Sequence, residues 1–508
     1  MKNNNVRFII AAIILILSVI VTVAACSAPD GGGNNGKIDN NNPDPIQSDD
    51  PEGITPERFT PSLPDDIDYG GYEFRGTITI KNAFGSYTLC VDEETGDIIN
   101  DAIYNRNRYI EDKYNVVFKQ TEVTDFWQLK DLFKKSVMSG SDDFDVCVQI
   151  DREAYNLAVE GYALSVDALP YLDITQPWYA HDINKAVSVG NKYFIAYSDE
   201  CMSLYEGYMI LAFNKQLVAD LGLENLYDLV KSGKWTYDKF FDLCRAAAFD
   251  MDGDGKMTDS DRYGVVSQDD IFLSNFWVCA GIQTVIKDAN GMLALNIAGN
   301  ERFYALLEKT RQNIFGGGKI YFAAGLDKAD IFKPSSEQDG ERDISRQQFQ
   351  NNLALFYSAT MAKIPEMRSM DADFGVIPFP KADEDQDRYC VRSCDGWPKI
   401  VPNHAPNPER TSVILEALGA EARNTTLPAF KEISLRTKFA RDDESAEMID
   451  IIFNSLAVDL GDLFFLDIRD AFMNEVRGKG GFASVTEKRS ASFQKILDKV
   501  NEAAEKLD

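Results

Sequence analysis

The chain has 508 residues, 44 % of them hydrophobic, which allows a large core that we expect to be divided between two domains. Its formal charge of −29 at pH 7 argues against a nucleic-acid or anionic-membrane surface, because both require clustered Lys and Arg. Only two histidines are present, His181 and His404, so a catalytic mechanism based on imidazole has little material.

Residues 1–26 have the pattern of a secretory signal peptide. Lys2 and Arg7 precede an apolar run that ends in Val23-Ala-Ala-Cys26, which resembles the bacterial lipobox. That motif implies a lipid on Cys26 and attachment to the extracellular face of the bacterial cell membrane. The alternative is an uncleaved membrane span, since the run is almost long enough. Residues 27–66 are rich in Gly, Asn, Asp and Pro and predict a disordered tether.

The body of the chain opens with strands and helices in alternation. Apolar patterns predict strands at 77–80, 116–119 and 144–150, separated by helices at 100–114 and 127–138. Such an order implies an α/β fold with a largely parallel sheet that is covered on both faces. Ligands of these sheets bind beyond the carboxyl ends of the strands, where Asp151 and Arg152 immediately follow the third strand.

A second group of elements begins with a predicted strand at 208–213. Thr236 suits the N-cap of a helix that we expect to run to about residue 249. Further on, the patterns predict strands at 263–266 and 353–357. They also predict helices from Asn407-Pro408, from Glu447 and, most clearly, from Ser492 to the end of the chain.

The segment from 250 to 261 has the spacing of a twelve-residue calcium loop. Carboxylates at alternate positions of a tight turn repel one another unless a cation lies between them, and an all-oxygen donor set favours calcium. The last ligand is Asp instead of Glu, and a strand follows instead of a helix, which favours a structural site over a sensor. The alternative is an acidic turn without metal. The expected ligands are Asp250, Asp252, Asp254, the Lys256 carbonyl, Thr258 and Asp261.

Seven further cysteines are scattered along the chain. Their odd number and apolar surroundings favour buried free thiols over a disulfide framework. Cys390 and Cys394 lack a second pair or a nearby histidine in zinc spacing, although a loop disulfide between them stays open. The seven are Cys90, Cys147, Cys201, Cys244, Cys279, Cys390 and Cys394.

Several short stretches, in order, resemble the family 1 extracellular solute-binding proteins, the lipid-anchored receptors of ABC sugar importers. No stretch is diagnostic alone, but together they span nearly the whole mature body and agree with the lipobox. The stretches are Tyr69–Phe74, Asn105–Arg108, Asp145–Arg152, Phe213–Lys215, Gly233–Thr236 and Asp373–Lys381.

The resemblance implies a two-lobed, type II periplasmic-binding-protein-like α/β fold in which hinge strands join the lobes and the ligand lies between them. The first lobe is expected to contain 67–202 and 345–402, and the second 203–344 and 403–508. The family type is mostly monomeric, which implies a monomer. Expected partners are a carbohydrate and the permease subunits of an importer, with the membrane reached only through the lipid.

Aromatic and charged residues in predicted loops are the candidate ligand contacts, because sugar receptors combine aromatic platforms with groups that hydrogen-bond hydroxyls. The family's carboxylate after the third strand matches Asp151. For each aromatic residue the alternative is packing inside a lobe. The candidates are Asp151, Arg152, Trp127, Trp178, Trp277, Trp397, Tyr205 and Tyr357.

The sequence therefore predicts a receptor that captures a carbohydrate, with an oligosaccharide favoured, and delivers it to an ABC importer. A cell-surface glycoside hydrolase is the first alternative, but a hydrolase needs two opposed carboxylates, and 81 acidic residues make such pairs uninformative. A surface sensor or scaffold on the same fold is the second alternative. We expect no enzymatic activity.

Overall fold

The computed structural model describes residues 58–79, 88–317, 319–324, 344–367, 370–394, 396–433, 442–478 and 480–507. Within these ranges no helix is long and apolar enough to cross a bilayer. The signal peptide, Cys26 and the tether up to residue 57 lie outside the described residues, so their assignment stays a prediction.

The first lobe is built around a four-stranded sheet in the order β12-β3-β1-β2. Strands β2 and β3 run parallel to β1, and β12 adds an antiparallel edge beside β3. The prediction of a largely parallel sheet is confirmed for this lobe. The strands are β1 (Tyr72–Thr79), β2 (Val116–Val123), β3 (Val146–Val148) and β12 (Lys399–Ile400).

Aspartate N-caps start the first two helices that pack on this sheet. Asp97 accepts from the backbone N–H groups of Ile99 and Asn100, and Asp125 accepts from Gln128. The helices of this lobe are α2 (Ile98–Tyr114), α3 (Phe126–Ser139), α4 (Asp151–Val159), the 3-10 helix η1 (Val166–Ala168), α5 (His181–Val187), α14 (Pro408–Asn424) and α15 (Thr426–Ile433).

The second lobe is built around a five-stranded mixed sheet in the order β10-β4-β9-β5-β8. Strand β5 runs parallel to β8 and β9, whereas β4 is antiparallel to both of its neighbours. Every residue of β4 and β9 is buried, in agreement with their mostly apolar sequences. The strands are β4 (Met209–Asn214), β5 (Tyr263–Gln268), β8 (Tyr321–Ala324), β9 (Ala354–Thr360) and β10 (Phe374–Ile377).

The predicted N-cap Thr236 is confirmed, since its hydroxyl accepts from the N–H of Lys239 at the start of α9. The helices of the second lobe are α7 (Lys215–Asp220), α8 (Leu226–Lys231), α9 (Tyr237–Ala247), α10 (Asp269–Phe272), α11 (Asn275–Val278), α12 (Glu301–Ile314), α13 (Ile344–Gln350), the 3-10 helix η3 (Met361–Met367) and α16 (Asp443–Phe453).

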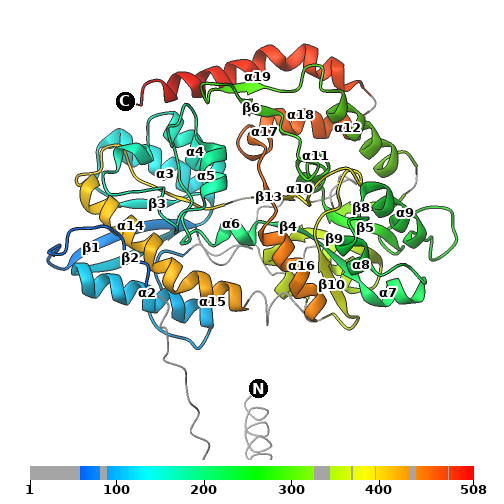
Figure 1. Cartoon of the computed structure of the whole chain (residues 1–508), viewed down its shortest axis with the longest axis horizontal. Helices are drawn as coiled ribbons and strands as arrows, with labels where there is room; N and C mark the ends of the chain where they lie inside the picture. The colour runs from blue at the N-terminus through cyan, green and yellow to red at the C-terminus, as the bar shows by residue number, and fades with distance from the viewer. Residues whose placement is uncertain are drawn as a thin grey trace, which may run out of the picture. The chain divides into compact units, whose positions relative to one another are not determined.

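The C-terminal part of the chain links the two lobes. Figure 1 shows α19 passing above both, and it packs on β7 of a small hairpin, on α18 and on α4 of the first lobe. Lys499 of α19 pairs with Glu160 just after α4, at 3.2 Å. The remaining elements are α6 (Ser203–Glu206), the hairpin β6 (Val285–Lys287) and β7 (Leu293–Leu295), the pair β11 (Val391–Arg392) and β13 (Leu456–Ala457), α17 (Leu460–Leu463), α18 (Leu466–Arg477) and α19 (Phe482–Ala504).

Strand pairing corrects the expected division into lobes. We expected 345–402 in the first lobe, yet β9 and β10 both pair with β4 and complete the second sheet. We expected 403–508 in the second lobe, yet α14 and α15 pack on α2 of the first. The apolar patterns predict these elements correctly. They do not indicate which of the two sheets a buried strand joins or a buried helix packs against.

The structure also corrects the predicted end of the tether. Residues 58–66 were expected to be disordered, but Arg58 pairs with Glu421 and Phe59 exchanges two hydrogen bonds with the side chain of Asn424. The folded body therefore includes Arg58 and Phe59, which are fastened to the end of α14. The expectation of free thiols is confirmed for the seven cysteines, of which all but Cys90 are buried.

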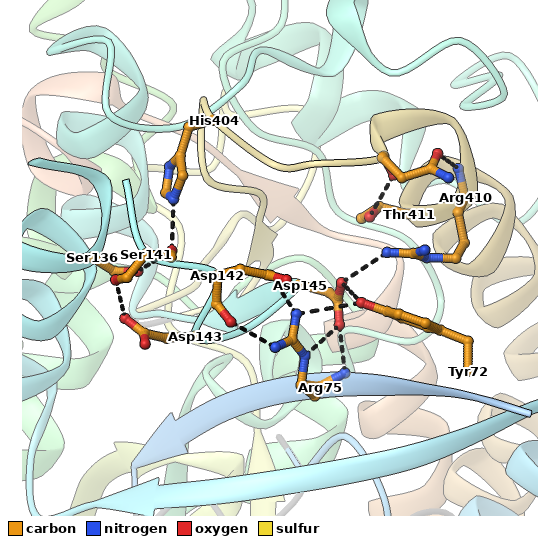
Figure 2. A network of polar contacts seen from close by, with 11 residues as sticks. Tyr72, Arg75, Ser136, Ser141, Asp142, Asp143, Asp145, His404, Arg410 and Thr411 are labelled. Atoms are coloured by element: carbon orange, nitrogen blue, oxygen red, sulfur yellow. Dashed lines mark hydrogen bonds and ion pairs between the residues drawn. The ribbon is translucent and has the colours of Figure 1, made fainter. Parts of the chain in front are cut away.

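A buried carboxylate ties the amino end of β3 to its neighbours (Figure 2). Asp145, 2 % exposed, accepts from the Tyr72 hydroxyl at 2.7 Å and from the backbone and side chain of Arg75 at 2.8 and 3.2 Å. Arg410 of α14 reaches the same carboxylate at 3.4 Å and lies 3.4 Å from the centre of the Tyr72 ring. The acid thus joins β1, β3 and α14.

We predict that Asp145→Ala lowers the free energy of unfolding by roughly 3–5 kcal/mol, because it leaves two guanidinium groups and a hydroxyl without their shared acceptor. Chemical denaturation of the purified protein measures the change. Asp142→Ala is the matched control: it removes a 56 % exposed carboxylate that pairs with the same Arg75, and it should cost about 1 kcal/mol or less. Equal losses in the two variants would contradict the prediction.

Candidate ligand surfaces between the lobes

The carboxyl end of the first sheet carries an exposed aromatic and cationic surface. Trp127, at the start of α3, is 54 % exposed, and its ring lies 4.8 Å from that of Phe126. The Arg152 guanidinium lies 5.1 Å from the Phe126 ring, and the Lys130 ammonium lies 5.3 Å from the Trp127 ring. Of the aromatic residues predicted to contact the ligand, Trp127 is the most open, and it lies where the fold places ligands.

Local structure fixes this surface in place. Asp125 caps α3, so the helix begins directly after β2 and its first residues lie at the edge of the sheet. Gln149, which follows β3, donates to the Phe126 carbonyl at 3.1 Å. Phe126 then packs against a buried cluster of Ile78, Val148, Ile150 and Trp397. The exposed ring of Trp127 therefore stands on an ordered base.

A second surface is a series of three adjoining hollows, two of which are lined by residues of both lobes and the third by the second lobe alone. The first, of about 470 Å³, lies between α5, α6 and the end of α16, and the others measure about 190 and 410 Å³. Arg388 lines all three. In the first hollow the aromatic side chains are Tyr205, Tyr208 and Phe453, and the polar ones include His181, Asp182 and Asn454.

This mixture of aromatic walls and polar groups of both signs suits a neutral polar molecule better than an ion. Of the predicted site residues only Tyr205 lines the first hollow, where its ring lies 5.8 Å from those of Tyr208 and Phe453. Sequence reasoning missed Phe453 and Arg388, because nothing in the local pattern indicates that α16 and the segment before β11 meet α5.

Four of the predicted aromatic contacts lie in the core, which corrects the expectation that their rings face a ligand. Trp178 and Trp397 are 2 % exposed, Trp277 is fully buried and Tyr357 is 3 % exposed. A Cβ on Gly419 would lie 2.8 Å from the Trp178 ring, so α14 covers that ring directly. Tyr357 lies within β9, between β4 and β5.

Trp277 serves a buried polar cluster. Its indole N–H donates to Asp459 at 3.0 Å, and Thr284 donates to the same carboxylate through its backbone and hydroxyl at 2.9 Å. Burial and then the neighbouring charge of Asp462 raise the pKa of Asp459 to about 6, against the effect of these donors. An indole that satisfies a buried acid is fixed by that bond and is not available for stacking.

The carboxylate of Asp151 is likewise hydrogen-bonded within the protein. It is 1 % exposed, and its carboxylate accepts from the backbone of Arg152 and Gly396 and from the Tyr197 hydroxyl. Its position after β3 is as predicted. The expectation that it binds sugar hydroxyls is corrected, since its oxygens face the protein.

The acidic loop from 250 to 261 has convergent carboxylates. One oxygen each from Asp250, Asp252 and Asp254 lie within 4.8 Å of one another. Asp250 accepts from Gly253 and Gly255, whose φ angles of 72° and 79° make the tight turn possible.

Two further predicted ligands close the base of this loop. Asp261, 1 % exposed, accepts from the N–H groups of Met251 and Thr258 at 2.8 and 2.7 Å. The Thr258 carbonyl accepts from the hydroxyl of Tyr263, the first residue of β5, and this strand confirms the one predicted after the loop. Lys319 donates to the carbonyl of Gly255, next to Lys256, at 3.0 Å. The oxygen donors present fit a hard cation such as calcium.

No protein-family model matches the sequence. No curated protein matches it either. Solved structures do match. A cyclo/maltodextrin-binding protein complexed with maltotetraose is 11 % identical, with a TM-score of 0.54 over 85 % of this chain and 96 % of that one. UgpB from Mycobacterium tuberculosis, in complex with glycerophosphocholine, is 15 % identical, with a TM-score of 0.53 over 84 % and 98 %.

The GacH receptor of Streptomyces glaucescens, solved unliganded and with acarbose, is 12 % identical, with a TM-score of 0.53 over 84 % of this chain and 99 % of that one. These likenesses extend over both sheets and cover the matched chains almost completely. The chain therefore has the two-lobed, type II periplasmic-binding-protein-like fold of these binding proteins.

Proposed function

We propose that this protein is a family 1 solute-binding protein that captures a carbohydrate between its lobes for an ABC importer and does no chemistry on it. The observation that carries the proposal is the exposed ring of Trp127 together with the partly exposed Phe126, Arg152 and Lys130 beside it at the carboxyl end of the first sheet. An indole face suits the C–H face of a sugar ring, and the flanking cations can donate to its hydroxyls. The fold shared with sugar-binding receptors supports the same reading.

The ligand itself is tested by a thermal-shift screen. The panel contains maltotriose, maltotetraose, other oligosaccharides and glycerophosphocholine, since a protein of the same fold was solved with that last compound. A ligand bound only by the folded state, at a hundredfold excess over Kd, stabilises by about 2.7 kcal/mol. A stabilising sugar recovered unchanged supports the receptor. A sugar that is cleaved supports the glycoside hydrolase, and stabilisation by glycerophosphocholine alone contradicts the carbohydrate proposal.

We predict that Trp127→Ala weakens the affinity for the stabilising sugar roughly tenfold or more, because an exposed aromatic platform is lost. Isothermal titration calorimetry measures the effect. Phe249→Ala is the matched control: Phe249 is 57 % exposed and has Arg262 5.6 Å from its ring, but it lies at the acidic loop of the second lobe. The control should bind like the wild type. Undiminished affinity of the Trp127 variant would remove this surface from the ligand site.

We propose that the loop from 250 to 261 holds a structural calcium ion through Asp250, Asp252 and Asp254, with the Lys256 carbonyl, Thr258 and Asp261 completing the shell. The cation would offset the repulsion among three carboxylates that the backbone draws together. Since the loop leads from α9 into β5, an ordered loop would fix the relative position of two elements of the second lobe.

We predict that a chelator lowers the melting temperature of the protein and that Asp252→Asn abolishes this sensitivity. Differential scanning calorimetry with and without added calcium measures both effects. Asp259→Asn is the control, because Asp259 is an exposed residue of the same loop at a position that supplies no ligand. A melting temperature that chelation leaves unchanged would contradict the calcium site.

We also propose that the protein is anchored to the extracellular face of the membrane by a lipid on Cys26. The lipobox supports this proposal, and fastening of Arg58 and Phe59 to α14 would fix the point at which the tether leaves the body. We predict that Cys26→Ser moves the protein from the membrane fraction to the medium on cell fractionation. Retention of the variant in the membrane would instead support an uncleaved span.

A further inference from the structure

Asp151 joins parts of the chain that are far apart in sequence. It is the first residue of α4, and its carboxylate accepts from the N–H of Gly396 at 2.9 Å and from the Tyr197 hydroxyl at 3.1 Å. In return the N–H of Asp151 donates to the Gly396 carbonyl at 2.8 Å. These two reciprocal hydrogen bonds fix the relative position of two backbone segments that are 245 residues apart in the sequence.

The close fit around residue 396 requires glycine. A Cβ there would lie 2.7 Å from the Tyr197 ring and 3.2 Å from the Asp151 carboxylate. No side chain other than hydrogen therefore allows the Gly396 backbone to reach both partners. The three residues form one packed junction, which we call the Asp151 junction.

Tyr197 and Gly396 lie beside or within segments in which the chain passes from one lobe to the other, and we call these segments crossings. Tyr197 precedes the first crossing, which ends in β4, and Gly396 lies in the return crossing, between β11 and β12. The two crossings are also bonded to each other. The backbone N–H of Trp397 donates to the Ser203 hydroxyl at 3.0 Å, and that of Cys394 donates to the Gly207 carbonyl at 2.9 Å.

The Asp151 junction adjoins the proposed ligand surface. Arg152, the next residue, lies beside the Phe126 ring, and Trp397, the residue after Gly396, packs in one cluster with Phe126. The group that can touch ligand, Arg152, therefore directly follows Asp151, which holds both crossings. A shift of Arg152 on ligand binding would pass to the crossings through the backbone of α4.

We propose that Asp151 is a positioning residue, which holds the two crossings at the carboxyl edge of the first sheet and couples ligand contact at Arg152 to the movement of the lobes. This inference rests on the proposed capture of a solute between the lobes. It replaces the expected direct contact between Asp151 and sugar hydroxyls. The carboxylate acts through Gly396 and Tyr197 and does not itself touch the ligand.

The test compares Asp151→Asn and Tyr197→Phe by hydrogen exchange without ligand and by calorimetry with the sugar from the screen. Asn has one acceptor oxygen and no charge, whereas both oxygens of the Asp151 carboxylate accept hydrogen bonds, so the contact with Gly396 is weakened or lost and the amides of Gly396 and Trp397 should exchange at least tenfold faster. Affinity for the sugar should fall in both variants. The double variant should lose no more than the larger single loss, since both changes break the same junction.

Tyr155→Phe is the matched control. Tyr155 lies on the same helix, α4, and its buried hydroxyl has no hydrogen-bond partner among the described residues. Its removal should leave both the exchange of Gly396 and the affinity unchanged.

Three outcomes would overturn the inference. Weaker binding of Asp151→Asn with unchanged exchange at Gly396 would show direct ligand contact instead. Faster exchange with full affinity would show a junction that only stabilises the fold. Full affinity of Tyr197→Phe beside a loss in Asp151→Asn would separate the two residues. If the wild type binds no member of the panel, the proposed function is contradicted. If exchange at Gly396 is unchanged in the variants, only the inference about Asp151 is contradicted.

Discussion

The structure depends on how a single chain passes three times between two sheets. The first crossing leads from the Tyr197 region to β4, the second returns through β11 to β12, and α15 and α16 lie on opposite sides of the third. Buried polar contacts lie along the first two crossings. The ion pair of Arg392 and Asp462, both 3 % exposed, is one of them. Charges removed from water in this way hold one geometry, because an unpaired partner would be costly.

The contacts between the lobes are unequal in kind. The Tyr155 ring of α4 stacks on Phe464 at a centroid distance of 4.1 Å, an apolar contact that tolerates small sliding. Glu160 instead accepts hydrogen bonds from the ammonium groups of Lys499 in the C-terminal helix and of Lys134 in its own lobe, in a partly exposed setting. Water competes with such pairs, so they guide the approach of the lobes more than they fix it.

Much of the fold could be predicted from local pattern. The helices at the start of the body, the strand at 208–213 and the N-cap Thr236 follow from apolar periodicity and capping chemistry, which act over a few residues. The division into lobes could not be predicted in this way, because the sequence of β9 fits a buried strand in either sheet. Its place beside β4 is decided by pairing, such as Ala212 with Tyr357, across long sequence distances.

The candidate site shows the same limit. The position of Asp151 after a strand was predictable, but its partner Gly396 could not be found from spacing, so its role was misjudged. Tryptophans in predicted loops looked accessible, yet Trp277 is buried by its bond to Asp459 and Trp178 by the close approach of α14. Exposure is a property of the assembled lobes, and Trp127 is open because no later segment of the described chain packs over it.

The antiparallel edge strand of the first sheet has a consequence for how the protein is made. Strand β12 and helices α14 and α15 belong to the first lobe but follow β4 to β10 in the chain. During synthesis, all strands of the second sheet therefore emerge before the first sheet can be completed. The sheet that is begun first is finished last, and until then the carboxyl edge lacks Trp397, which packs in one cluster with Phe126.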